Sequence, residues 1–302
     1  MHTLRSTRFT RAFSSAAMAP MVSPHAQAAT APRVQNFING RFEDSATSKW
    51  IPLMSPATNK IVCWVPESTP DELKRAEEGA LNAFKKWRDV PIQQRQRVMF
   101  RLQQLIREAT EELAVSITTE QGKTLSDARG DIFRGLEVVE GCSAIGHLSM
   151  GETQGGLARG LDTYSYRQPL GVTAGICPHN FPMMIPLWMA PLSIVCGNSM
   201  VLKPSEKGPG TSERRDPPRR TAPAHQTVPP FLPFSGASMI LARLAQQAGI
   251  PDGVLQVVPT SPPVWPHIKP KCALLRFNGP LTSLTHGLLV LLTRWSTAPT
   301  TR

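Results

Sequence analysis

Two short runs of this 302-residue chain carry side chains that could bind a nucleotide or stabilise a developing negative charge. In the first, Lys203-Pro204-Ser205-Glu206 directly follows an apolar run, where a strand of a parallel sheet would end and where such sheets bind ligands. A carboxylate there can accept hydrogen bonds from both hydroxyls of an adenosine ribose while a lysine donates to them. Because Glu206 would repel a 2′-phosphate, the pattern predicts NAD rather than NADP. The alternative is a solvated ion pair of Lys203 and Glu206 that binds nothing.

The second run is Cys177-Pro178-His179-Asn180-Phe181-Pro182, which follows an earlier apolar run. The side-chain amide of Asn180, held by the end of a strand, could donate a hydrogen bond to an oxyanion that develops during a reaction. The alternative is a structural role, in which Asn180 caps the apolar segment that follows it.

The cysteines do not predict a metal site or a disulfide framework. They are five in number, widely separated and without a CxxC pair. They are interpreted as reduced thiols of the core: Cys63, Cys142, Cys177, Cys196 and Cys272.

A parallel sheet is the element that would position both runs. Compact apolar strands are expected at Gly171 to Ile176 and Ser199 to Leu202, separated by the apolar stretch Phe181 to Cys196. A helix at Ile240 to Ala248 and a third strand at Val254 to Val258 extend this arrangement. The fold class is therefore α/β, with a Rossmann-type parallel sheet.

Upstream of the sheet the sequence predicts a strand-rich segment followed by helices. Asn39-Gly40 indicates a hairpin, and Thr69-Pro70-Asp71-Glu72 has capping-box spacing at the start of a helix that runs to Trp87. A second helical run starts at Ile92 and continues until Gly122. The remaining expectations are a third helix over 131–146 and a glycine-rich turn over 151–160.

The net charge of +11 is unevenly distributed. Residues 34–211 hold 19 Lys plus Arg and 19 Asp plus Glu, whereas residues 1–33 hold four Arg and no acid. The charge therefore does not indicate a nucleic-acid partner. A serine-rich segment with arginines and no acid until Glu43 predicts a mitochondrial presequence over 1–33 and import to the matrix. The stretch Phe181 to Cys196 is too short and too rich in proline to predict a membrane span.

Two later segments depart from the α/β pattern. Residues 212–236 are rich in proline and arginine, which predicts a disordered insertion. Residues 259–302 are again proline-rich and lack acids, so they are not expected to continue the sheet. The NAD-binding region is accordingly assigned to 34–211 and 237–258.

Taken together, these motifs resemble the aldehyde dehydrogenase superfamily. The similarity rests on Pro178-x-Asn180-Phe181-Pro182, Gly197-Asn198 and Lys203-Pro204-Ser205-Glu206, with Glu120-x-Gly122-Lys123 upstream and Pro251-Asp252-Gly253 downstream. Within the superfamily, the Cys177 to Pro191 segment and Lys207-x-x-Gly210 resemble the methylmalonate-semialdehyde dehydrogenases most.

The resemblance implies a homo-oligomeric enzyme that oxidises a small semialdehyde with NAD, releases carbon dioxide and transfers the acyl group to coenzyme A. It implies Asn180 as the oxyanion donor and Lys203 and Glu206 as ribose ligands. The region around Cys177, His179 and Lys207 would add further cofactor contacts. No nucleic-acid, membrane or metal partner is implied.

The chain departs from the family at the nucleophile. The family uses a cysteine in a later segment, and Lys271-Cys272-Ala273-Leu274 does not match that context. The expectation is therefore a truncated, incomplete member without activity of its own. Two alternatives are a non-catalytic module that binds NAD or associates with complete subunits, and an active enzyme that uses Cys177 or Cys272 instead.

Overall fold

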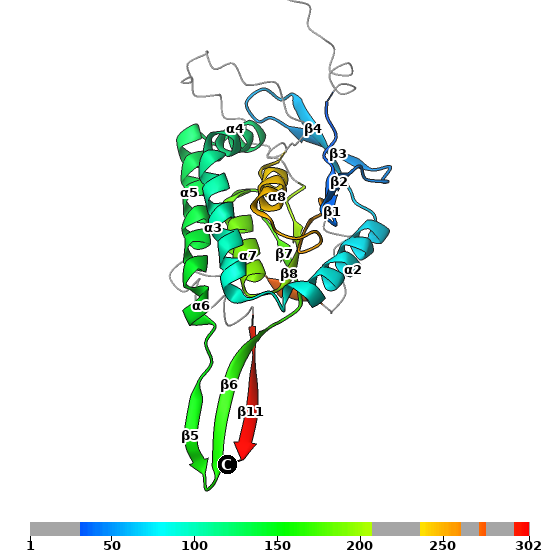
Figure 1. Ribbon diagram of the computed structural model, residues 1–302. Coiled ribbons are helices and arrows are strands. Elements are labelled where there is room, and N and C mark those ends of the chain that lie inside the picture. Colours follow the sequence, from blue (N-terminus) through cyan, green and yellow to red (C-terminus); the bar gives the residue numbers. More distant parts are fainter. Residues whose placement is uncertain (1–30, 207–235, 261–271, 276–292, 302) are drawn as a thin grey trace, which may run out of the picture.

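The computed structural model describes residues 31–206, 236–260, 272–275 and 293–301 (Figure 1). Its body is a six-stranded sheet, ordered β10-β7-β8-β9-β1-β2, with helices on both faces. The expected α/β class is confirmed. Most of the expected presequence and insertion lies outside the described residues.

Three parallel strands form the centre of the sheet: β7 (Val172–Ile176), β8 (Ser199–Lys203) and β9 (Leu255–Val257). The three strands predicted from the sequence are thus confirmed. In the register, Ile176 lies opposite Lys203, so β7 and β8 end side by side. The segments that follow these strands consequently meet at one edge of the sheet.

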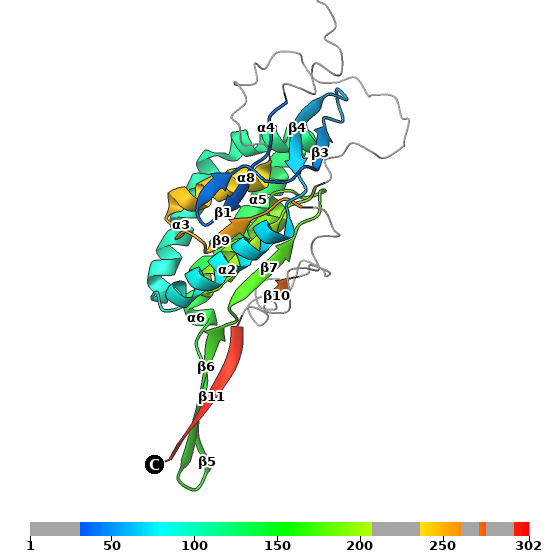
Figure 2. The same cartoon turned by 90° about the vertical axis from the view of Figure 1, so that its right-hand side faces the viewer.

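Two crossover helices connect these strands on one face, as Figures 1 and 2 show. They are α7 (Met184–Val195) between β7 and β8, and α8 (Ala237–Ala248) between β8 and β9. Every residue of α7 is buried, which explains why its sequence has no polar face. Pro191 lies inside α7.

Helix α2 (Pro70–Trp87) covers the opposite face (Figure 2). Alternate residues of β8 point to the two faces, as the two-residue period of a strand requires. Val201 belongs to a cluster with Leu73 and Ala76 of α2, whereas Met200 belongs to the larger cluster on the face of α7. Hydrophobic side chains therefore hold the sheet on both sides.

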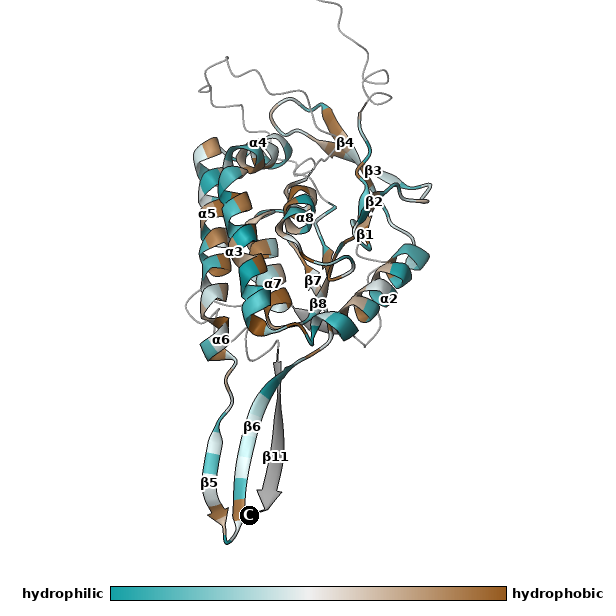
Figure 3. Ribbon diagram, in the orientation of Figure 1, coloured by the Kyte–Doolittle hydropathy of each residue, from teal (hydrophilic) through white to brown (hydrophobic). Residues whose placement is uncertain are grey.

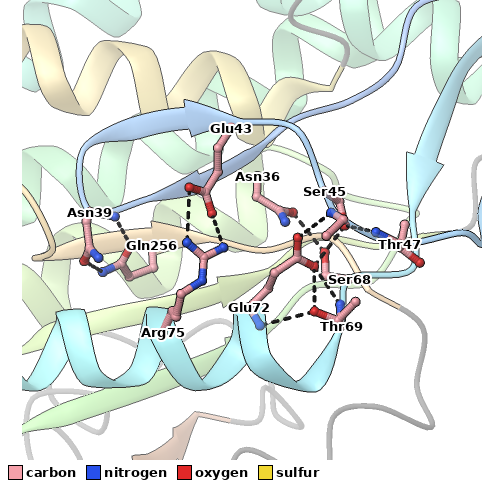
Figure 4. A network of polar contacts seen from close by, with 11 residues as sticks. Asn36, Asn39, Glu43, Ser45, Thr47, Ser68, Thr69, Glu72, Arg75 and Gln256 are labelled. Carbon is pink, nitrogen blue, oxygen red and sulfur yellow. Dashed lines mark hydrogen bonds and ion pairs between the residues drawn. The ribbon is translucent and has the colours of Figure 1, made fainter.

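The capping box predicted at the start of α2 is confirmed. The Thr69 side chain accepts the Glu72 N–H, and the Glu72 carboxylate accepts the Thr69 N–H. Glu72 also accepts hydrogen bonds from the Ser45 hydroxyl at 2.9 Å and the Ala46 N–H at 2.9 Å (Figure 4). One buried carboxylate thus joins the helix start to the N-terminal segment.

The helical run predicted from Ile92 to Gly122 is two helices. The α3 helix (Ile92–Glu108) ends at Ala109, and α4 (Thr110–Gln121) ends at Gly122, which adopts a left-handed conformation with φ of 79°. The next helix, α5 (Leu125–Gly141), starts earlier than predicted because Thr124 caps it. A 3₁₀ turn (Cys142–Ala144) and α6 (Ile145–Leu148) follow.

The Asn39-Gly40 hairpin is confirmed, and it joins the main sheet. It connects β1 (Asn36–Ile38) to β2 (Arg41–Glu43), and β1 pairs antiparallel with β9. The Asn39 N–H donates to the Gln256 side chain at 2.7 Å, and Gln256 donates back to Asn39 at 3.0 Å (Figure 4). The strands β3 (Trp50–Met54) and β4 (Ile61–Pro66) form a separate pair.

A three-stranded antiparallel sheet projects from the body (Figure 1). It contains β5 (Thr153–Ala158), β6 (Leu161–Pro169) and β11 (Thr293–Thr301). The glycine-rich turn predicted over 151–160 is therefore wrong, because most of that segment is strand β5. The glycines of this segment favoured a turn when the sequence was considered alone. The segment is nevertheless a strand, because it pairs with β6.

The expectation that residues 259–302 do not continue the sheet is also wrong. Strand β10 (Cys272–Leu275) pairs parallel with β7, and β11 pairs with β6 along its whole length. Both strands are defined by partners distant in the sequence, which local composition cannot indicate.

Hydropathy follows this arrangement. In Figure 3 apolar residues gather on α7 and the central strands, while β5 and β6 of the projecting sheet are mostly polar or neutral. Among the described residues, no helix has the length and apolar character that crossing a membrane would require.

We predict that Glu72→Ala lowers the free energy of unfolding by about 2–3 kcal/mol, because the Ala46 and Thr69 N–H groups lose their acceptor. Arg75→Ala, on the same helix, is the control: it breaks only an exposed ion pair with Glu43 and should cost less than about 1 kcal/mol. Urea titration of both variants measures the difference, and equal losses would contradict the role of Glu72.

Candidate functional site

The candidate site lies at the edge where the parallel strands end. Cys177 follows β7, and its N–H donates to the Lys203 carbonyl at 2.9 Å. Pro204 follows β8, and Pro259 lies just beyond β9. The structure therefore brings together the two runs that the sequence singled out. This edge is where α/β sheets bind ligands.

Lys203 and Glu206 form an ion pair at this edge. The Lys203 ammonium donates to a Glu206 carboxylate oxygen. The residues are 4% and 7% exposed, so the alternative of a solvated ion pair is wrong. Removing two charges from water costs several kcal/mol per ion, and a buried pair of this kind is a poor way to gain stability. Its retention here is consistent with a binding role.

Asn180 is exposed at the start of the loop between β7 and α7. The alternative that it caps the following helix is wrong, because the N-cap of α7 is Met183 and no side-chain cap bond is present there. His179 beside it is also exposed. The loop thus presents the Asn180 amide at the sheet edge.

Asp131 of α5 supplies the cap that α7 lacks. Its carboxylate accepts the Met184 N–H at 2.7 Å and pairs with the Lys123 ammonium at 2.9 Å. That ammonium lies 4.3 Å from the centre of the Phe181 ring. The loop bearing Asn180 is therefore fixed just beyond the amide by contacts with α5 and the α4–α5 turn.

The electrostatics of Asp131 reflect its burial. Asp131 is fully buried, and desolvation raises the pKa of its carboxyl, although the hydrogen bond from Lys123 opposes that shift. Sequence reasoning did not assign Asp131 a role. In the sequence, Asp131 is one of several polar residues on an amphipathic helix. Nothing near it indicates that its carboxylate would accept the Met184 N–H of α7.

The described cysteines are poorly suited to nucleophilic chemistry. Cys63, Cys142, Cys177 and Cys196 are buried and form no disulfide bond, as the sequence predicted. Burial raises the pKa of the thiols of Cys142, Cys177 and Cys196, in the last case to about 12. Because the thiolate is the nucleophile, these thiols are held in their unreactive form. The Cys272 side chain lies outside the described residues.

A cavity of about 70 Å³ opens at the site. It offers room for several waters or one phosphate-sized group. Its walls come from the strand ends, the start of α8 and the end of α4, and they include His179, Ser205, Pro259, Ser238 and Glu120. Pro204 and Ser205, which lie between Lys203 and Glu206 in the sequence, also line the cavity, so the ion pair lies next to it.

Lys207, predicted from the sequence as a further cofactor contact, lies outside the described residues. Within the described ranges, no group of three or more His, Cys, Asp or Glu side chains is placed to hold a metal ion. Glu120, noted in the sequence only as part of a motif, lines the cavity.

Comparison with known proteins shows which family this chain resembles. Residues 42–214 match the model of the aldehyde dehydrogenase family. A mitochondrial acylating methylmalonate-semialdehyde dehydrogenase of Arabidopsis thaliana is 50% identical over 227 residues, which are 75% of this chain and 33% of the relative. A probable counterpart in Aedes aegypti is 50% identical over 230 residues, 76% of this chain and 39% of the relative. The chain thus spans well under half the length of these relatives.

A solved structure gives the same result for the fold. A protein of Sinorhizobium meliloti 1021, provisionally assigned as a methylmalonate-semialdehyde dehydrogenase and complexed with NAD, superposes with a TM-score of 0.70 at 35% identity. The match covers 81% of this chain and 45% of that protein.

We predict that Asp131→Ala lowers the free energy of unfolding by about 3–5 kcal/mol, because Lys123 and the Met184 N–H both lose a largely buried partner. The control is Arg129→Ala on the same helix, which breaks an exposed ion pair with Glu111 and should cost at most about 1 kcal/mol. Chemical denaturation of the two variants provides the comparison. A loss for Asp131→Ala no larger than the control would show that the cap on α7 is not important.

Proposed function

The chain belongs to the aldehyde dehydrogenase family, and we propose that it carries the NAD-binding part of a methylmalonate- or malonate-semialdehyde dehydrogenase. The observation that supports this most is the buried Lys203–Glu206 pair at the end of β8. The identity to mitochondrial enzymes of that name supports the same assignment.

The residues at the sheet edge fit a dinucleotide. Lys203 and Glu206 are proposed to hydrogen-bond the adenosine ribose, with Glu206 disfavouring a 2′-phosphate. Cys177, His179 and Lys207 are proposed to complete the cofactor contacts. Gln121, on the cavity wall, has a buried side-chain oxygen without a hydrogen-bond partner, which indicates a place for a polar ligand. When bound, NAD would supply the acceptor for a hydride.

The proposed reaction of the complete enzyme is oxidation of the semialdehyde, loss of carbon dioxide and transfer of the acyl group to coenzyme A. In that reaction Asn180 would donate its amide N–H to the oxyanion formed when a thiolate adds to the aldehyde. The contacts of Phe181 and Met184 hold the chain just beyond Asn180, which supports a fixed position for the loop that carries the amide.

We propose that this chain alone does not catalyse that reaction. Four cysteines are buried in the core, burial keeps the thiols of Cys142, Cys177 and Cys196 protonated, and Cys272 is on edge strand β10 beside β7. An oxyanion donor has nothing to stabilise unless a thiolate first attacks the aldehyde. Use of Cys177 or Cys272 as a substitute nucleophile is the competing proposal.

A second candidate function is association with further subunits. The projecting sheet exposes Tyr164, Tyr166 and Leu157, and β5 is at its edge. An exposed strand edge is suited to pairing with another chain, and the two tyrosines on the neighbouring β6 add exposed apolar surface beside it. We propose that any such assembly is homo-oligomeric or includes complete subunits. We propose the mitochondrial matrix as its location, since the relatives are named as mitochondrial.

NAD should bind the purified chain more tightly than NADP, and Glu206→Gln should reduce that preference, because the glutamine amide does not repel a 2′-phosphate. Isothermal calorimetry measures both affinities. Arg75→Ala, which breaks an exposed ion pair with Glu43 and removes none of the proposed cofactor contacts, should leave the preference unchanged. Equal affinity of the unaltered chain for the two cofactors would contradict the role of Glu206.

Incubation with NAD, coenzyme A and methylmalonate semialdehyde should form NADH no faster than buffer alone. The same result is expected for Cys177→Ala and Cys272→Ala, since neither thiol is proposed to react. Absorbance at the NADH band measures the rate. A steady rate that either substitution abolishes would establish the substitute-nucleophile proposal instead.

A further inference from the structure

Ser68, the residue before the capping box of α2, joins the start of that helix to the segment that leaves β9. Its hydroxyl lies 2.5 Å from the Pro259 carbonyl oxygen, although the two residues are 191 positions apart. The Thr260 hydroxyl lies 3.4 Å from the Ser68 carbonyl oxygen in return. Ser68 and Thr260 are both 0% exposed, so water does not reach these contacts. One buried serine therefore connects two distant segments at the carboxyl edge of the sheet.

The Pro259 carbonyl lies just beyond the hydrogen-bond ladder of the parallel strands. The Val258 N–H donates to the Leu202 carbonyl at 2.9 Å, and the next residue is a proline, which has no N–H to continue the ladder. Because Pro259 is buried, its carbonyl needs a donor from outside the sheet. Ser68 supplies that donor. A side chain of the β4–α2 connection thus holds the chain where it leaves β9.

The hydrogen-bond direction at Ser68 is set by its two oxygen neighbours. Its hydroxyl is also 2.9 Å from the Asn36 side-chain oxygen, but it has one proton, and the shorter contact with Pro259 takes it (Figure 4). Asn36 of β1 is 0% exposed, and its Nδ2 has no partner among the described residues. Turning that amide by 180° lets Nδ2 donate to the Ser68 oxygen. Asn36 then donates to Ser68, and Ser68 donates to Pro259.

Pro259 belongs to the wall of the cavity at the proposed cofactor site. Residues that follow all three parallel strands form this wall, including Pro178 after β7 and Pro204 after β8. Within the described residues, Ser68 is not part of the cavity lining. It can therefore act on a ligand in the cavity only through the position of Pro259.

We propose that Ser68 is a positioning residue for the cofactor site, because its hydrogen bond fixes the part of the cavity wall that Pro259 forms. The inference rests on the proposed NAD-binding function and adds a residue that affects affinity without touching the ligand. A wall that is ordered before binding spares the complex the entropic cost of ordering it. Loss of the Ser68 hydroxyl should therefore weaken NAD binding in a chain that remains folded.

The test measures NAD binding by calorimetry for the unaltered chain and Ser68→Ala, with Ser193→Ala as the matched control. Ser193 is also 0% exposed, and its hydroxyl makes a 2.7 Å hydrogen bond with Thr173, near the amino end of β7 and away from the cavity lining. Both substitutions remove one buried hydroxyl, so both should lower the urea midpoint of unfolding to a similar extent. The dissociation constant for NAD should rise about fivefold for Ser68→Ala and less than about twofold for Ser193→Ala.

Two further substitutions separate the hydrogen bond of Ser68 from its packing. Ser68→Cys keeps the shape of the side chain but leaves only a weak donor, whereas Ser68→Thr keeps the hydroxyl. Ser68→Cys should bind NAD about as weakly as Ser68→Ala, and Ser68→Thr should recover most of the affinity. Because Ser68→Cys leaves no cavity, it also decides the question if Ser68→Ala does not fold.

The outcomes distinguish this inference from the cofactor proposal. Unchanged NAD affinity in Ser68→Ala and Ser68→Cys, or equal losses in Ser68→Ala and Ser193→Ala, overturns the inference and leaves the cofactor proposal standing. Recovery of affinity by Ser68→Cys, or a folded Ser68→Thr that binds as weakly as Ser68→Ala, overturns the role of the hydrogen bond in the same way. Absence of NAD binding by the unaltered chain overturns the cofactor proposal and the inference with it.

Discussion

The buried ion pair of Lys203 and Glu206 at the end of β8 is the interaction on which the proposed cofactor site depends. Two charges have been taken out of water for a contact that hydrophobic side chains could replace without loss of stability. Lys203 is placed by the pairing of β8 with β7, whose last hydrogen bond runs from the Cys177 N–H to the Lys203 carbonyl. The position of the pair is thus a property of the sheet.

The helices position the rest of the site from the other side. α7 is apolar throughout, so it cannot cap its own start, and Asp131 of α5 accepts its first N–H. Lys123 then links Asp131 to the Phe181 ring. This arrangement fixes the residues that follow Asn180 while the amide itself remains exposed. The buried polar contacts of Asp131 therefore hold the start of α7, while the loop before it leaves Asn180 accessible to a ligand.

Much of this organisation could be predicted from sequence wherever the signal is local. The capping box at Thr69 and Glu72 and the Asn39-Gly40 turn depend on residues a few positions apart, and the three apolar strands depend on their own composition. The burial of Glu206 could not be predicted, because burial depends on which residues surround a side chain in the folded chain and not on its neighbours in the sequence.

The misses have two physical causes. Strand β5 pairs with the neighbouring β6, but its glycines indicated a turn. Strands β10 and β11 are stabilised by pairing with partners distant in the chain, which the proline-rich composition of that segment did not indicate. The functional contacts of Asp131 likewise depend on α7, more than fifty residues later. Sequence reasoning located the chemical groups, and the structure was needed to find what holds them.

The central claim is that the carboxyl edge of β7 and β8 is a cofactor site. Hydrogen–deuterium exchange with and without NAD tests it most directly. We expect slower exchange on adding NAD in peptides that contain 177–180 and 203–206, with exchange in the projecting sheet at 153–169 unchanged. Unchanged exchange at the sheet edge under saturating NAD, or protection confined to the projecting sheet, would contradict it.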